Sequence, residues 1–374
     1  MQKADIENKL ELCIESFKSV LYERDETFLE NMAKSNMDQG NLARYMLWEW
    51  TQGVGLYGLW KLFEKKHDQR CLDVLTEYYD ARIAEGLPSK NINTMAPIFA
   101  LSYLYEYTKN EKYGDICKEW AEWAMHGLAR AGEGGFQHVT SDRVNDGELW
   151  DDTLFMAVLP LANIGRILGR QDYIDEAVYQ YLVHTKYLAD KKTGLWYHAW
   201  DCSHREDWAD QETGLSHEFW GRSIGWVPVA ILDELDFMEP SHPQYEKLCA
   251  LVRNLLESVC RYQSADGRWY QVVDKGGKEG NWLETSCSCL YTAAIVKAVH
   301  KGILPEQYLE QAVKGYEAVI HSLAWEGEDL LVGGVCIGTG VGDYRHYCER
   351  PTSVNDLHGV GAFLLMCAQM ETVM

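Results

Sequence analysis

The feature that most constrains the fold of this 374-residue chain is a regular alternation of two kinds of predicted helix. Helices of the first kind are apolar nearly all round and rich in small residues, so they must be buried on every side. Helices of the second kind have apolar residues at three- and four-residue steps with charged residues between them, which is typical of an outer layer. The first kind begins near Thr51, Met95, Thr153, Gly225, Leu290 and His358. The second kind covers residues 68–83, 112–128, 172–188, 242–263 and 306–323, and the N-terminal segment Ile6–Leu21 supplies a sixth.

Six buried helices that alternate with six half-exposed helices predict two concentric rings. We therefore expect an all-α fold, an (α/α)6 barrel with short strands in its rim loops. The repeat is longer and less regular than that of a stacked solenoid, which favours a closed toroid. Because no Pro- or Ser-rich linker interrupts the pattern, we expect one catalytic domain over residues 1–374.

The charge balance limits the kinds of partner that the chain can bind. The formal net charge is −22, and a surface of this charge repels nucleic acid and anionic membranes. A small anionic ligand held by a local cluster of Arg and His is still allowed. The N-terminus lacks the apolar run of a signal peptide, and no stretch has the apolar length of a membrane span. Eleven scattered cysteines indicate reduced thiols rather than a disulfide framework. We expect a cytoplasmic protein and leave its oligomeric state open.

Three loops after amphipathic helices share one pattern, in which a Gly is followed by a large aromatic residue and, two positions later, by a polar residue. The copies are GGFQHV with Phe136 and His138, GLWYHA with Trp196 and His198, and GRWYQV with Trp269 and Gln271. Each reads as a tight turn that enters a short strand. If the units are equivalent, the three polar side chains converge at the mouth of the barrel where Asp152 enters, in a cavity lined by Trp196, Trp226 and Trp269. In the alternative, the aromatic rings cap the core and the polar groups satisfy loop backbone.

Two adjacent acids, Asp151 and Asp152, stand between Trp150 and the third buried helix. Adjacent residues at a helix start point about 100° apart, so we expect them to have different roles. One caps the helix, while the other faces inward, where burial and the helix N-terminus shift its pKa in opposite directions. A carboxyl group balanced in this way can serve as a general acid and then as a base. The plain alternative is that both belong to an ordinary helix cap.

Other polar segments also precede buried helices. Arg222 lies between Trp220 and Trp226 in the sequence, and this combination suits the binding of a ring-shaped ligand that bears a carboxylate. In the alternative, Arg222 caps neighbouring helix ends. The segments 91–97 and 280–288 either line the mouth or cap helices. The glycine-rich stretch that carries Arg345, His346 and Arg350 lacks the GK[ST] of a phosphate loop and indicates a long structured loop that closes the barrel. The roles of these three residues stay open.

We expect no metal ion and no organic cofactor. His198 and His204 are six residues apart on a loop, which is not the spacing of metal ligands, and Cys287 and Cys289 do not form a CxxC motif. The chain also contains neither an HExxH motif nor a phosphate loop.

Several long motifs in order resemble the unsaturated rhamnogalacturonyl hydrolases, glycoside hydrolase family 105. They are LWDDTLFM, GLWYHAW, WGRSIGWV, GNWLETSCS and VCIGTGVGDYRHYCERPTSVNDLHGVGAFLLM, and they span the chain from about Asn91 to Met366. The resemblance implies an (α/α)6 barrel. It also implies an unusual glycosidase, which hydrates the C4=C5 double bond of an unsaturated uronic acid at the non-reducing end. The resulting hemiketal collapses and releases the neighbouring sugar, so a second catalytic carboxylate is not required.

The resemblance implies roles for individual residues. Asp152 matches the family's catalytic acid/base, and Asp151 falls on a variable position, as the helix cap or a solvent-facing residue. His198 and, less closely, His138 match histidines on the substrate side. Arg222 and Trp226 match substrate contacts, with Arg222 as the partner of the uronate carboxylate and the two histidines adding positive character. We also place the rings of Trp150 and Trp196 in the substrate site.

The expected substrate is a small anionic oligosaccharide, namely unsaturated galacturonyl-rhamnose from rhamnogalacturonan I. The alternatives are the same chemistry on an unsaturated glucuronyl saccharide, another (α/α)6 sugar enzyme such as an inverting glycosidase or an epimerase, and a barrel that only binds saccharides. The sequence does not fix the neighbouring sugar or the preferred chain length.

Overall fold

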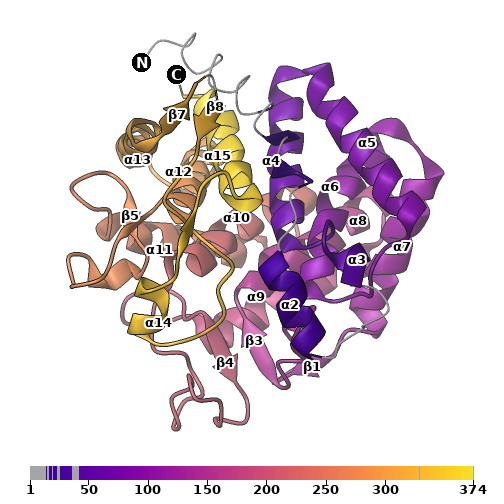
Figure 1. Cartoon of the computed structure of the whole chain (residues 1–374). Helices are drawn as coiled ribbons and strands as arrows, with labels where there is room; N and C mark the ends of the chain where they lie inside the picture. The colour runs from indigo at the N-terminus through magenta and orange to yellow at the C-terminus, as the bar shows by residue number, and fades with distance from the viewer. Residues whose placement is uncertain are drawn as a thin grey trace.

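The computed structural model describes residue 14 and residues 17–18, 20–22, 26–35, 42–327 and 329–373. Among these residues, six helices form an inner ring, in which each helix packs on the next and α15 packs on α4, so that the ring closes (Figure 1). They are α4 (Trp50–Lys66), α6 (Ile92–Thr108), α8 (Leu159–Leu168), α10 (Gly221–Phe237), α12 (Thr285–His300) and α15 (Leu357–Met370). All six lie where the sequence predicts buried helices.

A second layer surrounds this ring. It contains α5 (Gln69–Glu85), α7 (Glu111–His126), α9 (Gln171–Leu188), α11 (Tyr245–Arg261) and α13 (Leu309–Ser322), and each packs on the inner helix that precedes it. This arrangement confirms the predicted (α/α)6 barrel. The expected sixth outer helix, Ile6–Leu21, lies largely outside the described residues, although Phe17 and Leu21 are buried in the core. The short helices α2 (Glu26–Ser35) and α3 (Leu42–Tyr45) were not predicted.

The burial pattern explains why the two kinds of helix separate. In α10, nearly every residue from Gly221 to Leu235 is buried, so this helix has no face for solvent. In α11, burial is confined to one stripe that includes Leu248, Val252 and Leu255, while most of the charged residues of the helix are exposed. A helix with one apolar stripe is stable only with that stripe against the ring and the rest in water.

The junction of α4 and α15 depends on two glycines. A Cβ atom on Gly58 would lie 2.3 Å from the carbonyl oxygen of Gly361, and one on Gly361 would lie 2.5 Å from the carbonyl oxygen of Val54. Both distances are far shorter than van der Waals contact. The first and last inner helices therefore approach closely only because these positions lack side chains.

Gly58→Ala is expected to destabilise the barrel because the new methyl group meets backbone that cannot move aside. We expect a loss of about 1–3 kcal/mol, the usual range for overpacking a tight core. The measurement is the free energy of unfolding in urea. Gly333→Ala is the matched control, because a Cβ at Gly333 meets only Val354, at 3.6 Å. Equal stability losses in the two variants would contradict this account of the junction.

The start of the third inner helix departs from the expected α-helix. Residues Leu154–Val158 form a π-helical turn, η2, in which the Leu159 N–H donates to the carbonyl of Leu154. Pro160 follows directly and has no N–H to continue the regular ladder. Such π-helical turns are frequent at functional sites.

Short antiparallel strand pairs join the helices, as expected for rim loops. The pairs are β1 (Arg130–Ala131) with β2 (Gly135–Phe136), β3 (Glu148–Trp150) with β4 (Ala199–Asp201), β5 (Trp269–Tyr270) with β6 (Leu283–Glu284), β7 (Ala324–Glu326) with β8 (Asp329–Leu331), and β9 (Val335–Cys336) with β10 (Thr352–Ser353). The chain also forms the single-turn helices η3 (Val273–Lys275) and η4 (Glu306–Tyr308) and the short helix α14 (Tyr344–Cys348). Strands β3 and β4 lie at the end of the barrel opposite the C-terminus (Figure 1).

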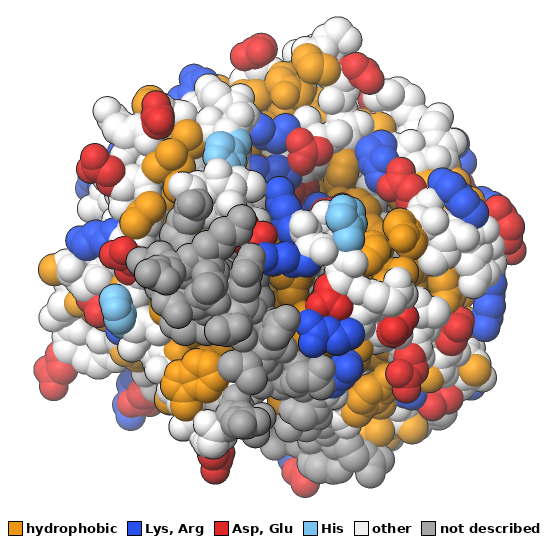
Figure 2. All heavy atoms as spheres, turned by 90° about the horizontal axis from the view of Figure 1, so that it is seen from above, with side chains coloured by type: hydrophobic (Ala, Val, Ile, Leu, Met, Phe, Trp, Pro, Cys, Tyr) orange, Lys and Arg blue, Asp and Glu red, His pale blue; other side chains and the backbone are white. Residues whose placement is uncertain are grey.

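Charged side chains close the other end of the ring. Lys297 of α12 pairs with Asp233 and Asp236 of α10, and Tyr57 of α4 donates a hydrogen bond to Asp233. The space-filling view from above shows basic side chains intermixed with acidic ones on this end (Figure 2). Within the described residues, no helix is long and apolar enough to cross a membrane.

Candidate active site

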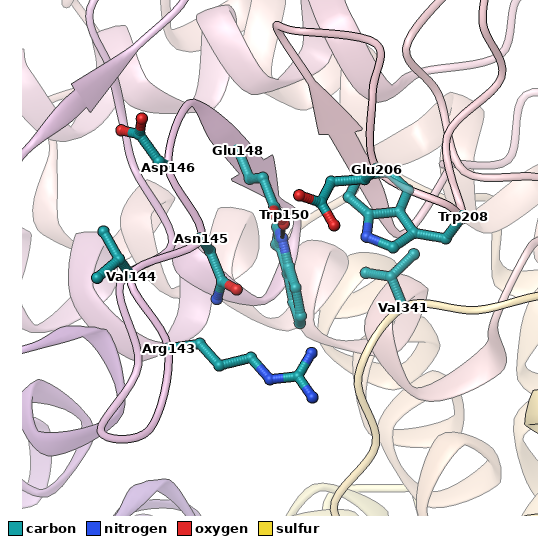
Figure 3. Close-up of a pocket in the computed structure, with 9 residues that line it drawn as sticks. All are labelled: Arg143, Val144, Asn145, Asp146, Glu148, Trp150, Glu206, Trp208 and Val341. Atoms are coloured by element: carbon teal, nitrogen blue, oxygen red, sulfur yellow. Dashed lines mark hydrogen bonds between the residues drawn. The ribbon is translucent and has the colours of Figure 1, made fainter. Parts of the chain in front are cut away.

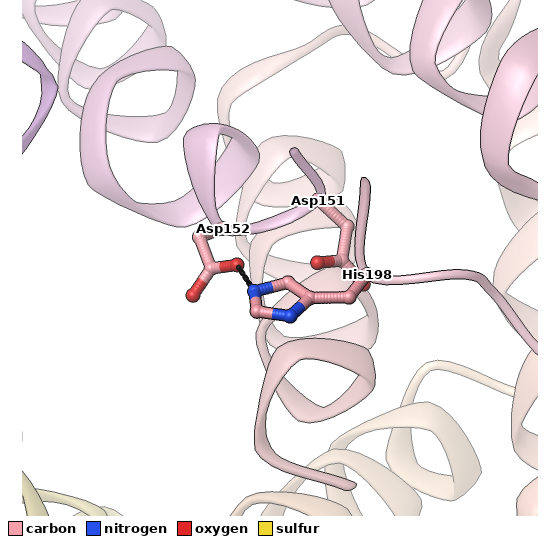
Figure 4. A group of neighbouring side chains, drawn as sticks. All are labelled: Asp151, Asp152 and His198. Atoms are coloured by element: carbon pink, nitrogen blue, oxygen red, sulfur yellow. Dashed lines mark ion pairs between the residues drawn. The ribbon is translucent and has the colours of Figure 1, made fainter. Parts of the chain in front are cut away.

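The pairing of β3 with β4 brings the two acids to the predicted histidine. Trp150 lies opposite Ala199, and the N–H of Asp151 donates to the carbonyl of His198 at 3.1 Å. The Oδ2 atom of Asp152 then lies 3.0 Å from Nε2 of His198 (Figure 4). The expected convergence of Asp152 and His198 at one end of the barrel is confirmed.

The structure corrects the expected role of Asp151. Its side chain is completely buried, and neither carboxyl oxygen has a hydrogen-bond partner of good geometry among the described residues. It therefore neither faces solvent nor caps the helix through its side chain. The angle of about 100° between neighbouring side chains of a helix does not apply to this pair, because Asp151 lies in a turn between β3 and the helix and not in helical backbone. Figure 4 shows Asp151 and Asp152 approaching the His198 imidazole from two sides.

The two carboxyl groups differ in their electrostatic surroundings. Burial raises the pKa of Asp151 well above its ordinary value, and the charge of Asp152 adds to this. Burial also acts to raise the pKa of Asp152, but the neighbouring His198 and, more weakly, Arg222 hold it below its ordinary value. These opposite shifts favour the neutral form of Asp151 and the ionised form of Asp152, an arrangement that suits acid–base chemistry. The Asp152 side chain keeps 15% of its surface exposed, so a ligand can reach it.

The imidazole of His198 is held at both nitrogens. Its Nδ1 atom lies 2.8 Å from the hydroxyl of Tyr347, and Nε2 faces Asp152. Tyr347 belongs to α14 and is fully buried. Sequence reasoning singled out its neighbours Arg345 and His346 and missed Tyr347, because a tyrosine in a glycine-rich loop carries no distinctive signal. Arg345 instead forms an exposed ion pair with Glu349.

Tyr347→Phe is expected to lower kcat by about 10-fold, because it removes one hydrogen bond that orients His198 and leaves a buried ring nitrogen unpaired. Substrate affinity should change less, since the Tyr347 hydroxyl is hydrogen-bonded to His198 and does not contact the substrate directly. Steady-state kinetics on an unsaturated disaccharide measure both quantities. The control is Tyr344→Phe, whose hydroxyl donates to the carbonyl of Glu279. An unchanged kcat in Tyr347→Phe would contradict the positioning role.

His138 reaches the same site from the first rim loop. Its ring stacks on Trp150 with centroids 4.4 Å apart, and its Nδ1 atom lies 2.8 Å from the hydroxyl of Thr153. Burial lowers the pKa of His138 to about 3. This burial argues against the expectation that His138 adds positive charge to the site, because it favours the neutral form of the imidazole.

Arg222 lies beside the site and is almost fully buried. Its guanidinium donates to the backbone carbonyls of Cys336 and, at 2.9 Å, Ile337. It lies 4.4 Å from the ring centre of Trp220 and 5.6 Å from that of Trp50. Trp50 thus replaces Trp226 as the second ring beside this guanidinium.

Cys336 is held by several elements of the barrel mouth. The N–H of Cys336 donates a hydrogen bond to Glu284, and its sulfur accepts one from Gln271 at 3.0 Å. Its carbonyl accepts a hydrogen bond from Arg222 and lies 3.0 Å from Nε2 of His358. These contacts fix residues 333–356, which we call the C-terminal loop, against the mouth. Gln271 also donates to the carbonyl of Tyr347, which places the third polar residue of the rim-loop pattern beside the site.

The segments at two other inner helices contain the expected caps. Asn91 accepts a hydrogen bond from the N–H of Thr94 at the start of α6. Glu284 does the same for Cys287 at the start of α12, and its second oxygen binds the C-terminal loop through Cys336.

Three predicted cavity-lining tryptophans lie elsewhere. Trp196, Trp226 and Trp269 are at most 3% exposed and belong to the hydrophobic core, so the expectation that they line a shared cavity is wrong. Trp226 packs on Phe155 with ring centroids 4.8 Å apart. Large rings gain most from full burial, so each anchors its segment between helices. Trp196 therefore has little surface to offer a ligand.

A pocket of about 280 Å³ opens beside Trp150 instead (Figure 3). It is lined by Arg143, Val144, Asn145, Asp146, Glu148, Trp150, Glu206, Trp208 and Val341. The Nε1 atom of Trp150 donates to Glu148 at 2.6 Å, and burial raises the pKa of Glu148 to about 7. Apart from Trp150, sequence reasoning found none of these residues, because they come from three separate segments of the chain and most of them lie in irregular loops.

One group of the described residues has the proximity of metal ligands. Asp151, Asp152 and His198 each offer a ligand atom within 4.8 Å of the others. Two of these residues already form an ion pair, and burial favours the neutral form of the third. The absence of a metal ion and of a cofactor stays a prediction.

The family follows from a match over most of the chain. Residues 24–374 match the model of Glycosyl Hydrolase Family 88. The chain belongs to this family. It is a glycoside hydrolase. This match and the relatives that follow, which include an unsaturated rhamnogalacturonyl hydrolase and possible members of family GH105, together confirm the resemblance stated from its motifs.

This family 88 chain has relatives that are similar to it in sequence and in structure. The chain is 30% identical over 296 residues to the unsaturated rhamnogalacturonyl hydrolase YesR of Bacillus subtilis, covering 79% of this chain and 80% of that protein. A crystal structure of a possible member of family GH105 from Salmonella enterica is 30% identical, with a TM-score of 0.85 over 98% of this chain and 94% of the other. A similar protein from Klebsiella pneumoniae is 28% identical, with a TM-score of 0.85 over 100% and 95% of the two chains.

Proposed function

We propose that this family 88 enzyme removes an unsaturated uronic acid from the non-reducing end of short pectin-derived oligosaccharides by hydrating the C4=C5 double bond. The observation that carries the proposal is the pairing of Asp152 with His198 at the mouth, beside the buried carboxyl group of Asp151. The relative from Bacillus subtilis, named an unsaturated rhamnogalacturonyl hydrolase, supports the substrate class. The favoured substrate is unsaturated galacturonyl-rhamnose.

In this mechanism, Asp152 acts as general acid and then as general base. Its carboxyl proton goes to C4 of the vinyl ether, which leaves positive charge shared between C5 and the ring oxygen. Water then attacks C5 and gives a proton back to the Asp152 carboxylate, so the residue ends as it began. The hemiketal opens and the neighbouring sugar leaves. The net reaction consumes one water.

The resting ionisation of Asp152 has to change before the first step. The free site favours its carboxylate, because His198 and Arg222 lie nearby. A bound uronate brings a second negative charge, and a like charge raises the pKa of a carboxyl group. Substrate binding therefore promotes protonation of Asp152, and the neutral carboxyl of Asp151 keeps a proton within the cluster.

Arg222 is the proposed partner of the uronate carboxylate. Two of its nitrogens bind backbone carbonyls, and its Nε atom has no hydrogen-bond partner among the described residues. The fixed guanidinium charge attracts the uronate. His198 orients the substrate or the attacking water beside Asp152.

The decisive experiment incubates the protein with a panel of lyase-generated unsaturated disaccharides. Hydration destroys the conjugated uronate, so its ultraviolet absorbance should disappear, and mass spectrometry should show a gain of one water followed by cleavage. Cleavage with the absorbance retained would indicate an ordinary glycosidase, and binding without reaction would indicate a barrel that only binds saccharides. Loss of absorbance with glucuronyl but not galacturonyl substrates would reassign the sugar.

We also propose that the enzyme works in the cytoplasm on imported saccharides. Eight cysteines among the described residues are free thiols, and all of them except Cys202 are buried or half-buried: Cys71, Cys117, Cys202, Cys249, Cys260, Cys287, Cys336 and Cys348. Reduced thiols are typical of that compartment.

A further inference from the structure

We propose that Asp151, Asp152 and His198 together form a binding site for Zn²⁺, and that zinc taken up from solution at this site inhibits the enzyme. The ion is an inhibitor and not a cofactor, so the expectation that the reaction itself needs no metal ion is unchanged. Three features of the site support the inference: the proximity of the side chains, buried polar atoms that lack hydrogen-bond partners, and the orientation of the histidine ring.

The three side chains offer the kinds of ligand atom that zinc takes in proteins, namely carboxylate oxygen and imidazole nitrogen. One ligand atom from each lies within 4.8 Å of the other two, and Oδ2 of Asp152 lies 3.0 Å from Nε2 of His198. Zn–N and Zn–O bonds are about 2.0–2.2 Å long, so ligand atoms around a tetrahedral zinc ion lie about 3.4 Å apart. The two acids approach the imidazole from two sides (Figure 4), so small side-chain rotations bring the three atoms to these distances.

Buried polar atoms of this group lack hydrogen-bond partners of good geometry among the described residues. Both carboxyl oxygens of Asp151 are in this state, and the side chain is completely buried. Oδ2 of Asp152 and Nε2 of His198 are close to each other, but they too lack the geometry of a hydrogen bond. Burying a polar atom without a partner is costly. The gathering of such atoms at one place therefore indicates that the group takes up a ligand.

The charges of the group match a divalent cation. When both carboxyl groups are ionised, they balance the two charges of Zn²⁺, and a buried ion needs this compensation. Metal ligands bind in their deprotonated forms, so the ion takes the place of the proton that the buried Asp151 otherwise keeps. The ion can enter from the mouth, because 15% of the Asp152 side chain is exposed.

The imidazole of His198 is oriented as in metal-binding histidines. A metal-bound imidazole normally uses its second nitrogen for a hydrogen bond that fixes the ring. In His198 this nitrogen is Nδ1, which lies 2.8 Å from the hydroxyl of Tyr347. That hydroxyl also accepts a hydrogen bond from the N–H of Gly342 at 3.3 Å. When Nδ1 donates to Tyr347, the lone pair of Nε2 faces the two acids.

The ligand set favours zinc over the hard cations Mg²⁺ and Ca²⁺. These cations take mainly oxygen ligands, usually six or more, whereas one of the three side chains here binds through nitrogen. In the proposed reaction, Asp152 gives a proton to C4. A zinc ion on the Asp152 carboxylate occupies this group, so bound zinc stops turnover.

The test measures zinc binding without any substrate, by isothermal titration calorimetry of ZnCl₂ into the purified protein. Asp151→Asn replaces one ligand, and Tyr347→Phe removes the hydrogen bond that fixes His198. Asp146→Asn is the matched control, because Asp146 is an exposed acid on the preceding loop and lies outside the group. Cys202→Ser is a second control, because Cys202 is an exposed thiol and thiolates also bind zinc. The thermal midpoint Tm checks the folding of each variant.

We expect the wild type, Asp146→Asn and Cys202→Ser to share one zinc site of equal affinity. Loss of an outer hydrogen-bond partner typically lowers metal affinity by about 10- to 100-fold, so Tyr347→Phe should weaken binding by about 10-fold and Asp151→Asn by at least as much. In the rate assay, Zn²⁺ should inhibit the wild type, whereas Mg²⁺ at the same concentration should not. The zinc concentration for half-inhibition should rise in Asp151→Asn by the same factor as its dissociation constant.

Zinc binding of unchanged strength in Asp151→Asn would overturn the inference, because the ion would then lie elsewhere. So would the absence of zinc binding to the wild type. Equal inhibition by Mg²⁺ and Zn²⁺ would also overturn it, since that would indicate screening of charge and not a ligand site. These outcomes are distinct from failure of the proposed function, in which no unsaturated disaccharide loses its ultraviolet absorbance, because the calorimetric test needs no substrate.

Discussion

Asp152→Asn is expected to retain the fold and to lose nearly all turnover. The amide keeps the size of the carboxyl group and its place opposite His198, but it cannot give a proton to C4 or take one from water. General acid–base catalysis should therefore fall by about 10²-fold or more, while KM changes little. The measurement is kcat on the unsaturated disaccharide, with the thermal midpoint Tm as a check on folding.

Asp151→Asn is the matched control for this experiment. Because burial favours the neutral form of Asp151, replacing it with a neutral amide of the same shape should cost far less turnover. Equal losses in the two variants at normal Tm would contradict the division of roles between the two acids.

Arg222→Ala is expected to raise KM by about 10²-fold and to lower kcat by much less. The uronate carries its charge in both the ground state and the transition state, so its partner contributes mainly uniform binding. A hydrogen bond to a charged group is worth about 1.5–3 kcal/mol, which corresponds to about 10- to 100-fold in affinity. An unchanged KM with a collapsed kcat would contradict the assignment.

A second variant separates the charge of Arg222 from its hold on the C-terminal loop. Gln271 also binds that loop, through Cys336 and Tyr347, but carries no charge. If Gln271→Ala reproduced the KM defect of Arg222→Ala, the effect would come from the loop and not from recognition of the uronate.

Much of the fold could be predicted because the distribution of apolar residues around the helix differs between the two rings. A helix such as α10, apolar all round, can only be inside, and a striped helix such as α11 can only be outside. The π-helical turn at Leu154 was not predicted, because Pro160 shows that the helical ladder is interrupted but not how the chain compensates.

The central residues of the site were predicted from the sequence, whereas several residues around them were misplaced or missed. Asp152 and His198 were found because each belongs to a distinctive motif, and the β3–β4 pairing places them together. Asp151 was misplaced because helical geometry was extended one residue too far. Tyr347 was missed because its contact with His198 depends on how the C-terminal loop folds back over the mouth, which no local pattern encodes.

The close junction of α4 and α15 also has a consequence for synthesis of the protein. Since the first inner helix packs on the last, the ring closes only after the C-terminal helix has left the ribosome. The loop that carries Cys336 and Tyr347 directly precedes that helix, so His198 gains its tyrosine partner at the same late stage. Contacts between segments this distant in sequence also slow folding. A nascent chain is therefore expected to be inactive until its last helix docks, and the onset of activity reports completion of the barrel.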